Sequence, residues 1–341
     1  MTIVLTLIII AILIFFHELG HFAAARRVGI QIYEFSLGFG YRLFYVKKGE
    51  TEYSLRLIPL GGYVRMAGEE PGDMENPHGF NSRTPLEKLQ VAIAGPLMNF
   101  VLAVLIFIYV FSLIGIAQPV NEAIIGGVLK DNPAYQAGLK SGDKILAVND
   151  KNIASWNEFA QTIQNSPTGK PLKLKLSRGE GIKVLSVNTV LDKGTGKTSI
   201  GIYSVYTYDR QNILTSIKLG FVQTYQITSQ LLISLSMLVT GEASTSDLAG
   251  PVGIASMVDI AARGGYLLAF TGLLSVNLGL LNLLPIPALD GSRIVFALIE
   301  AVRRKPMNPD KEGYIHWLGF VFLMLIMVFT TYNDIIRLFK G

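Results

Sequence analysis

The chain has 341 residues, half of them hydrophobic, with a formal net charge of +5 and no cysteine. This composition excludes an ordinary soluble protein and any disulfide, and it indicates several membrane spans together with one soluble module. The basic residues cluster beside apolar segments, so we attribute the positive charge to membrane topology and not to nucleic-acid binding.

The first apolar segment, residues 2–25, is long enough to cross a membrane and contains a HExxH motif. It lacks a basic start and a small-x-small cleavage site, so we interpret it as a retained span and not as a signal peptide. No charged residue lies between residues 3 and 16. Because ionisable groups at membrane depth are costly, those of the motif indicate a functional site.

The motif predicts a metal site on one face of the first helix. His17 and His21 lie one helical turn apart, with Glu18 on the same side. Two imidazoles supply two of the three protein ligands of a typical catalytic zinc site, and zinc lowers the pKa of its water toward about 7 so that Glu18 can take the proton. The motif therefore predicts peptide-bond hydrolysis within or beside the bilayer. Two packing histidines are the alternative, but they explain neither the glutamate nor the apolar flanks.

Residues 32–66, between the first two spans, mix apolar side chains with turn formers. This pattern indicates short strands in a sheet or a re-entrant hairpin, and its turn formers include Gly38, Gly40, Gly61 and Gly62. An exposed strand edge there could receive another chain by strand addition. A cytoplasmic loop with ordinary hairpins is the alternative. The next segment, residues 76–87, is predicted to be a polar loop with His78 in solvent.

The remaining segments that are predicted to span the membrane are residues 91–116, 267–284 and 315–332. Residues 213–239 are ambiguous. With four crossings, the basic residues of the first loop and those at 303–305 both fall in the cytoplasm, as the positive-inside rule requires. A fifth crossing would place residues 303–305 outside, so we expect residues 213–239 to lie at the outer surface or to pack on the bundle.

Residues 118–206 are predicted to form a soluble domain. A turn at Asn149-Asp150, a capping box of Ser155 with Glu158 and an alternating strand at 172–176 indicate a small α/β module. The stretch NPAYQAGLKSGDKILAVN resembles PDZ domains of bacterial proteases, and another small α/β module is the alternative. A Gly-Leu-Gly-Phe carboxylate loop is not evident, so we do not expect capture of free C-termini.

The third apolar segment supplies a further candidate ligand, Asp290, in the sequence NLLPIPALDG. Pro285 and Pro287 cannot donate backbone hydrogen bonds, so the helix is expected to break just before Asp290 and to open a polar pocket. Capping of the following helix is the alternative role for Asp290. Asn282 either bonds between helices or holds substrate backbone. His316, at the start of the last span, is predicted to anchor the interface and to take no part in chemistry.

The motifs HELGH, NLLPIPALDG, GPLMN, AGPVGIA and SVNLGLLN, with the intervening PDZ-like module, make the chain resemble the site-2 protease family of intramembrane metalloproteases, of the bacterial RseP/RasP type. The resemblance covers nearly the whole chain. It implies that His17, His21 and Asp290 hold Zn²⁺ and that Glu18 is the catalytic base. It also implies a membrane-associated β-element that presents substrate in extended form. Residues linked by the resemblance to substrate handling are Asn282, Pro285, Gly38, Gly40, Gly61 and Gly62. One departure is the single PDZ-like module, where some relatives have two.

We therefore expect a polytopic α-helical membrane protein with about four transmembrane helices, a membrane-associated β-hairpin element and one inserted extracytoplasmic PDZ-like domain. The expected parts are an N-terminal catalytic membrane half, the PDZ-like domain, amphipathic connecting helices and a C-terminal catalytic membrane half, at residues 1–117, 118–206, 207–264 and 265–341. The expected location is the bacterial cytoplasmic membrane, with the N-terminus and the PDZ-like domain outside and the active site toward the cytoplasm.

The function that these features predict is zinc-dependent cleavage of the transmembrane segments of single-pass membrane proteins. The resemblance implies action after another protease has shed the outer domain, on anti-sigma factors or remnant signal peptides. The expected partners are such substrates, the lipid bilayer and a peptide or protein bound by the PDZ-like module, and no nucleic acid. Two alternatives are a catalytically silent PDZ-bearing receptor and a membrane zinc protease that acts on soluble tails.

Overall fold

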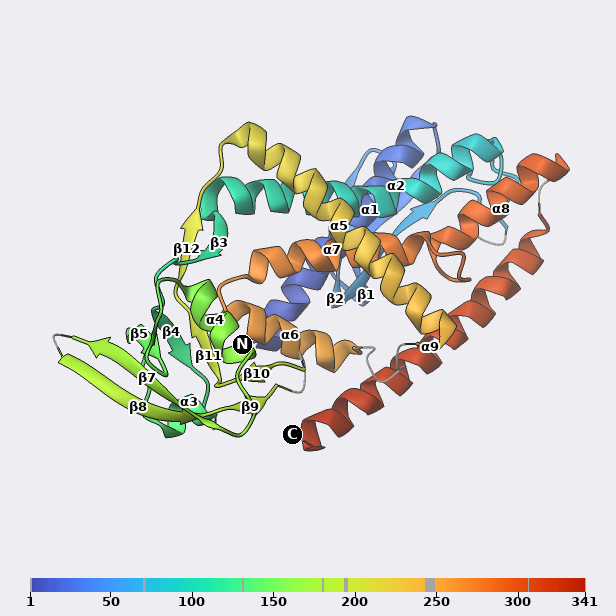
Figure 1. Ribbon diagram of the computed structural model, residues 1–341. Coiled ribbons are helices and arrows are strands. Elements are labelled where there is room, and N and C mark those ends of the chain that lie inside the picture. Colours follow the sequence, from blue (N-terminus) through green and yellow to red (C-terminus); the bar gives the residue numbers. More distant parts are fainter. Residues whose placement is uncertain are drawn as a thin grey trace. The chain divides into compact units, whose positions relative to one another are not determined.

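The computed structural model describes residues 2–69, 72–130, 132–179, 181–192, 196–242, 249–305 and 307–340. The chain divides into two compact units (Figure 1), of which the first combines residues 1–110 with residues 212–341 and the second comprises residues 111–211. The second unit is an insertion between two halves of the first. The expected soluble domain, at residues 118–206, falls inside it.

The first unit is built from helices around one hairpin-like β-element. Its helices are α1 (Thr2–Arg27), α2 (Pro85–Tyr109), α5 (Ile213–Thr240), α6 (Pro251–Arg263), α7 (Leu267–Leu283), α8 (Asp290–Arg303) and α9 (Pro309–Lys340), and its strands are β1 (Ile32–Lys48) and β2 (Thr51–Met66). A π-helical turn, Val110–Ile114, continues α2. Figure 1 shows α2 running beside α5 and α7, and α2 also packs against α1 and α8.

Three helical stretches of the described chain are long and apolar enough to cross a membrane: Thr2–Arg27, Pro85–Ile114 and Lys311–Arg337. The expected span at residues 267–284 forms α7, whose 17 residues extend ~26 Å. It is shorter than the others because the chain leaves the helix before Pro285. The apolar helices agree with the predicted membrane protein, while α7 falls below the length of the other three.

The ambiguous segment forms one continuous helix, α5, which packs against α2 and α7. Its buried residues, Ser216, Gly220, Thr224 and Ile227, are three or four positions apart and so share one face. The Thr224 hydroxyl donates to the Gly220 carbonyl at 2.8 Å, which satisfies this polar group within the helix. Helix α5 therefore packs on the helix bundle, which is one of the two expected arrangements.

The β-element is more folded than a simple hairpin, because β1 and β2 each bend. Phe35 of β1 lies opposite both Val64 and Tyr53, so two separate segments of β2 flank the same part of β1. Gly38 and Gly40 adopt φ values of +95° and +81°, which allow β1 to bend between its two halves. The predicted strands are thus present, and residues 62–66 form a short segment beside α1.

The break between α7 and α8 follows the two prolines. The Leu281 carbonyl has no helical donor at Pro285, and it accepts instead from the Leu284 amide at 3.1 Å. Ala288 then adopts φ +74°, and α8 begins at Asp290. A Cβ at Gly291 would lie 1.9 Å from the Leu284 carbonyl oxygen, so the turn requires glycine there. The predicted helix break is confirmed.

The second unit has its own apolar core around a four-stranded sheet of order β6-β5-β7-β8. Its elements are β3 (Ile116–Pro119), β4 (Ile125–Val128), α3 (Pro133–Gln136), β5 (Lys144–Val148), β6 (Lys151–Asn152), α4 (Trp156–Gln164), β7 (Pro171–Arg178), β8 (Gly181–Asn188), β9 (Val190–Leu191), β10 (Thr198–Ser199), β11 (Ile202–Ser204) and β12 (Tyr206–Asp209). Asn149 and Asp150 both have positive φ, which confirms the predicted turn between β5 and β6.

Local predictions in this unit succeed with one correction. Leu172, Leu174 and Leu176 of β7 are buried, as their alternation indicates. Ser155 accepts from the Glu158 amide and so caps α4. The Glu158 carboxylate, however, accepts from the Ala154 amide at 3.0 Å and not from that of Ser155, so the predicted reciprocal capping box is only half formed.

Candidate metal centre

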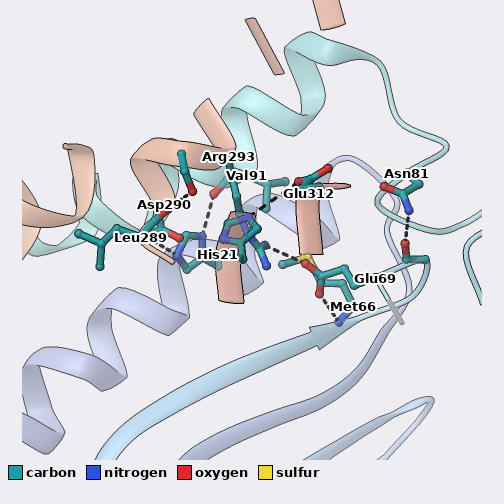
Figure 2. A network of polar contacts seen from close by, with 12 residues as sticks. His21, Met66, Glu69, Asn81, Val91, Leu289, Asp290, Arg293 and Glu312 are labelled. Carbon is teal, nitrogen blue, oxygen red and sulfur yellow. Dashed lines mark hydrogen bonds and ion pairs between the residues drawn. The ribbon is translucent and has the colours of Figure 1, made fainter. Parts of the chain in front are cut away.

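Three predicted ligands from opposite ends of the chain meet in the first unit. His17 Nε2 lies 3.0 Å from Asp290 Oδ2, and His21 Nε2 lies 3.2 Å from the same oxygen. The two Nε2 atoms are 3.2 Å apart. Figure 2 shows His21 beside Asp290, with Leu289 and Arg293 adjacent. The helical spacing in α1 and the proline-induced start of α8 together place three donors at one point.

These three side chains fit a zinc ion. Their donor atoms lie within 4.8 Å of one another. Ligands held at about 2.0–2.1 Å in a tetrahedron stand roughly 3.3 Å apart, close to the separations found here. Both histidines are buried, with 8% and 7% of their surfaces exposed. Two imidazole nitrogens and one carboxylate also form a donor set that catalytic zinc sites use, with a fourth position open.

Helix α2 shapes the space around the imidazoles. A Cβ at Gly95 would lie 2.2 Å from His21 Nε2, so only glycine leaves room for this ring. A Cβ at Gly20 would meet the Ala94 carbonyl oxygen at the same distance, which explains the close approach of α1 to α2. His21 Nδ1 lies 2.8 Å from the Val91 carbonyl, which accepts its hydrogen and leaves Nε2 free for a metal.

A cleft of about 540 Å³ adjoins the three donors. The predicted site residues that line it are His17, Glu18, His21, Gly61, Gly62, Asn282 and Asp290. A Cβ at Gly62 would come within 3.0 Å of the Glu18 side chain, so glycine keeps the β2 backbone close to this carboxylate. The remaining predicted residues, Pro285, Gly38 and Gly40, are absent from the lining and lie instead at the helix break and in the bend of β1.

The cleft also contains a histidine whose predicted position was wrong. His316 was expected to anchor the interface, but its ring lines the cleft, and its Nδ1 accepts a hydrogen bond from the Ala288 amide at 3.2 Å. Ala288 has a left-handed backbone and precedes Asp290 by two residues. The ring from α9 therefore supports the turn that presents the carboxylate. The sequence pattern of His316 next to Trp317 is typical of an interfacial anchor, and it contains no information about the contact with Ala288.

Sequence reasoning also missed Arg293 and Glu69. Arg293 lines the cleft one helical turn after Asp290, and its guanidinium donates to Glu69 at 2.8 Å. The other carboxylate oxygen of Glu69 accepts from the Met66 amide at the end of β2 (Figure 2). Glu69 thus connects β2 to α8. The i, i+3 spacing from Asp290 could have indicated Arg293, whereas no local pattern indicates its pairing with Glu69.

Apolar helices that carry two buried histidines and a partly buried aspartate as a donor set are typical of membrane metalloproteases, and comparison with known proteins agrees. Residues 5–326 match the model of peptidase family M50. A zinc metalloprotease RasP of Geobacillus kaustophilus is 35% identical over an alignment of 415 residues that covers 98% of this chain and 97% of the relative. The regulator of sigma-W protease RasP of Bacillus subtilis is 33% identical, with 99% of each chain covered.

A putative zinc metalloprotease of Clostridium perfringens is 38% identical over 339 residues, covering 98% of this chain and 99% of the relative. The chain therefore belongs to peptidase family M50. The predicted resemblance to site-2 zinc metalloproteases of the RseP/RasP type is confirmed. The alignment with the Geobacillus relative is longer than this chain, so that relative carries residues that this chain lacks, whereas the clostridial relative has nearly the same length.

Proposed function

We propose that this zinc metalloprotease cuts the transmembrane segments of single-pass membrane proteins, with His17, His21 and Asp290 as metal ligands and Glu18 as catalytic base. The observation that carries the proposal is the convergence of two α1 imidazoles and the first residue of α8 beside a cleft that also contains Glu18. A catalytically silent receptor would have no need of this buried polar set, whose burial is costly without a bound metal.

The chemistry of the site follows from the positions of its side chains. When bound, Zn²⁺ polarises the scissile carbonyl and makes water more acidic. Glu18 takes the proton of the attacking water and then passes it to the leaving amine. Arg293, with its positive charge at the cleft, is placed to stabilise the negative charge that develops on the carbonyl oxygen. His17, His21 and Asp290 would hold the metal next to the cleft that Glu18 also lines.

The β-element explains how a helical substrate becomes accessible. A transmembrane helix hides its carbonyls in hydrogen bonds and must unwind before attack. The segment 62–66 borders the cleft and offers a strand edge that compensates the released backbone groups, which otherwise cost several kcal/mol each in lipid. Gly61 and Gly62 let the Phe39 ring and the Glu18 side chain lie against this strand at the edge of the cleft, and the Asn282 amide, which also lines the cleft, is available to hold the substrate backbone. Glu69 keeps this edge attached to α8.

We further propose four membrane crossings, by α1, α2, α7 with its broken continuation, and α9. This topology puts the basic clusters in the cytoplasm and the second unit, as a PDZ-like substrate filter, outside. The name of the Bacillus subtilis relative, regulator of sigma-W protease, supports membrane-anchored regulators of transcription such as anti-sigma factors as substrates. Remnant signal peptides are also single transmembrane segments, so they are candidate substrates as well.

The decisive test compares two substrates with matched enzyme variants in vesicles. The wild-type enzyme should cleave a single-pass substrate whose outer domain is short, and it should leave a soluble-tail substrate intact. The substitution Glu18→Gln should abolish cleavage and leave zinc content unchanged, whereas Glu50→Gln, in the exposed β1–β2 turn, should have no effect. Wild-type cleavage by Glu18→Gln would contradict the assigned base, and preferential tail cleavage would favour the tail-cutting alternative.

A further inference from the structure

Asn99 of α2 is fully buried beside the candidate metal centre, and the proposed function assigns it no role. Its side-chain nitrogen lies 3.2 Å from His17 Nδ1. Its side-chain oxygen has no hydrogen-bond partner among the described residues. Buried amide oxygens are rarely left unpaired, and such an atom next to a proposed ligand ring calls for a physical explanation.

A hydrogen bond from the Asn99 nitrogen to His17 Nδ1 would conflict with metal binding by His17. If the Asn99 nitrogen donates to Nδ1, this ring carries its only hydrogen on Nε2, which then cannot bind a metal. A half-turn of the side-chain amide exchanges its oxygen and nitrogen with little change in shape, so the two orientations are told apart by their neighbours. After that half-turn the oxygen faces Nδ1, accepts its hydrogen and leaves Nε2 free. The same half-turn gives the unpaired oxygen a donor.

We propose that Asn99 is a positioning residue for the metal centre, whose amide oxygen accepts the Nδ1 hydrogen of His17 and so fixes the tautomer and the orientation of this ring. The inference rests on the proposed metal site. His21 is held in the same way by the Val91 carbonyl, a group that can only accept. Helix α2 thus orients both histidines of α1, once through its main chain and once through Asn99.

A second contact of Asn99 provides the control. Its main-chain carbonyl accepts from the buried Ser275 hydroxyl of α7 at 2.8 Å. This bond joins α2 to α7 but does not involve His17. If Asn99 only served helix packing, removal of the Ser275 hydroxyl would disturb the site as much as removal of the amide. If Asn99 orients His17, only the amide matters.

The test measures zinc affinity of the purified full-length chain by competition with a chromogenic chelator, so that activity is not the readout. Asn99→Leu should weaken zinc binding by roughly 10–100-fold, the usual effect of losing a group that orients a metal ligand. Asn99→Asp keeps an acceptor for Nδ1–H and should bind zinc at least as tightly as the wild type. Ser275→Ala should stay within about threefold of the wild type. Thermal melting of the metal-free variants shows whether each one folds.

Wild-type affinity in Asn99→Leu, or an equal loss in Ser275→Ala, would overturn the inference and leave the metal site itself intact. Should the leucine variant fail to fold, Asn99→Asp decides, because a tenfold loss there contradicts the acceptor role. A wild-type chain that binds no zinc would instead overturn the proposed ligand set.

Discussion

Two aspartates, one buried in the second unit and one partly buried in the first, show how the same side chain serves structure or chemistry. Asp143, in the second unit, receives two hydrogen bonds from the Arg178 guanidinium, each 2.7 Å, and one from the Lys140 amide. Asp290, in the first unit, faces the two imidazoles of α1. The partners of Asp143 neutralise and satisfy it completely. The atoms that face Asp290 are the imidazole nitrogens of His17 and His21, which are themselves possible metal ligands. A bound cation would therefore satisfy all three side chains.

The largest expected effect comes from Asp290→Asn. This change removes a charged ligand, so zinc affinity should fall by more than the roughly 10–100-fold typical of residues that orient ligands, and cleavage should disappear. The metal-free protein should melt at or above the wild-type temperature, because a partly buried charge without a cation partner has been removed. Zinc content, cleavage and melting of the metal-free chain are the measurements. Unchanged zinc content would contradict the ligand role.

Asp143→Asn should have the opposite profile. Weakening the ion pair between the buried Asp143 and the partly exposed Arg178 should destabilise the second unit by about 1.5–3 kcal/mol and leave zinc affinity unchanged. Hydrogen exchange of the strand amides of this unit, followed in the full-length chain, measures the loss. If zinc affinity falls together with this protection, the two units are coupled and the contrast between the aspartates fails.

The same carboxylate predicts a pH dependence. Burial alone would raise the pKa of Asp143, but the hydrogen bonds from Arg178 and the Lys140 amide outweigh it, so the pKa is lowered. A lowered folded-state pKa gives stability that is present above the unfolded value of about 3.9 and is lost as pH falls through the folded value. Protection of the second unit in the wild type should therefore decline below about pH 4. Asp143→Asn should remove this part of the decline.

A buried pair between α2 and α8 offers a smaller test of how Asp290 is positioned. The Lys88 ammonium lies 2.8 Å from the Glu300 carboxylate, and both side chains are largely buried. Lys88→Met leaves Glu300 without its partner and should loosen α8, with a several-fold loss of zinc affinity. The double variant with Glu300→Leu should recover most of it, because a buried pair is often replaceable by apolar residues. A double variant as weak as the single one would contradict this account.

The sequence predicts the second unit and the metal centre for different reasons. In the second unit, the β7 alternation and the Asn149-Asp150 turn are local patterns, so strands and turns follow directly. In the metal centre, HExxH fixes two ligands by helical spacing, and Asp290 was found because it follows two prolines in an apolar segment. Glu69, His316 and Asn99 were missed or misassigned because each meets its partner only after distant helices pack. Short-range patterns carry no information about such contacts.

The smallest expected effect concerns the turn before Asp290. Ala288 has φ +74°, whereas the positive-φ residues of the β5–β6 turn are Asn149 and Asp150, which tolerate this conformation better than alanine. Ala288→Gly should relieve strain and stabilise the first unit by about 0.5–1 kcal/mol. His316→Phe should remove the acceptor of the Ala288 amide and cost about 1 kcal/mol. Melting of the metal-free chain measures both changes. If the strain at Ala288 is needed to aim Asp290, Ala288→Gly will melt higher yet bind zinc more weakly, and this would make the turn part of the metal site.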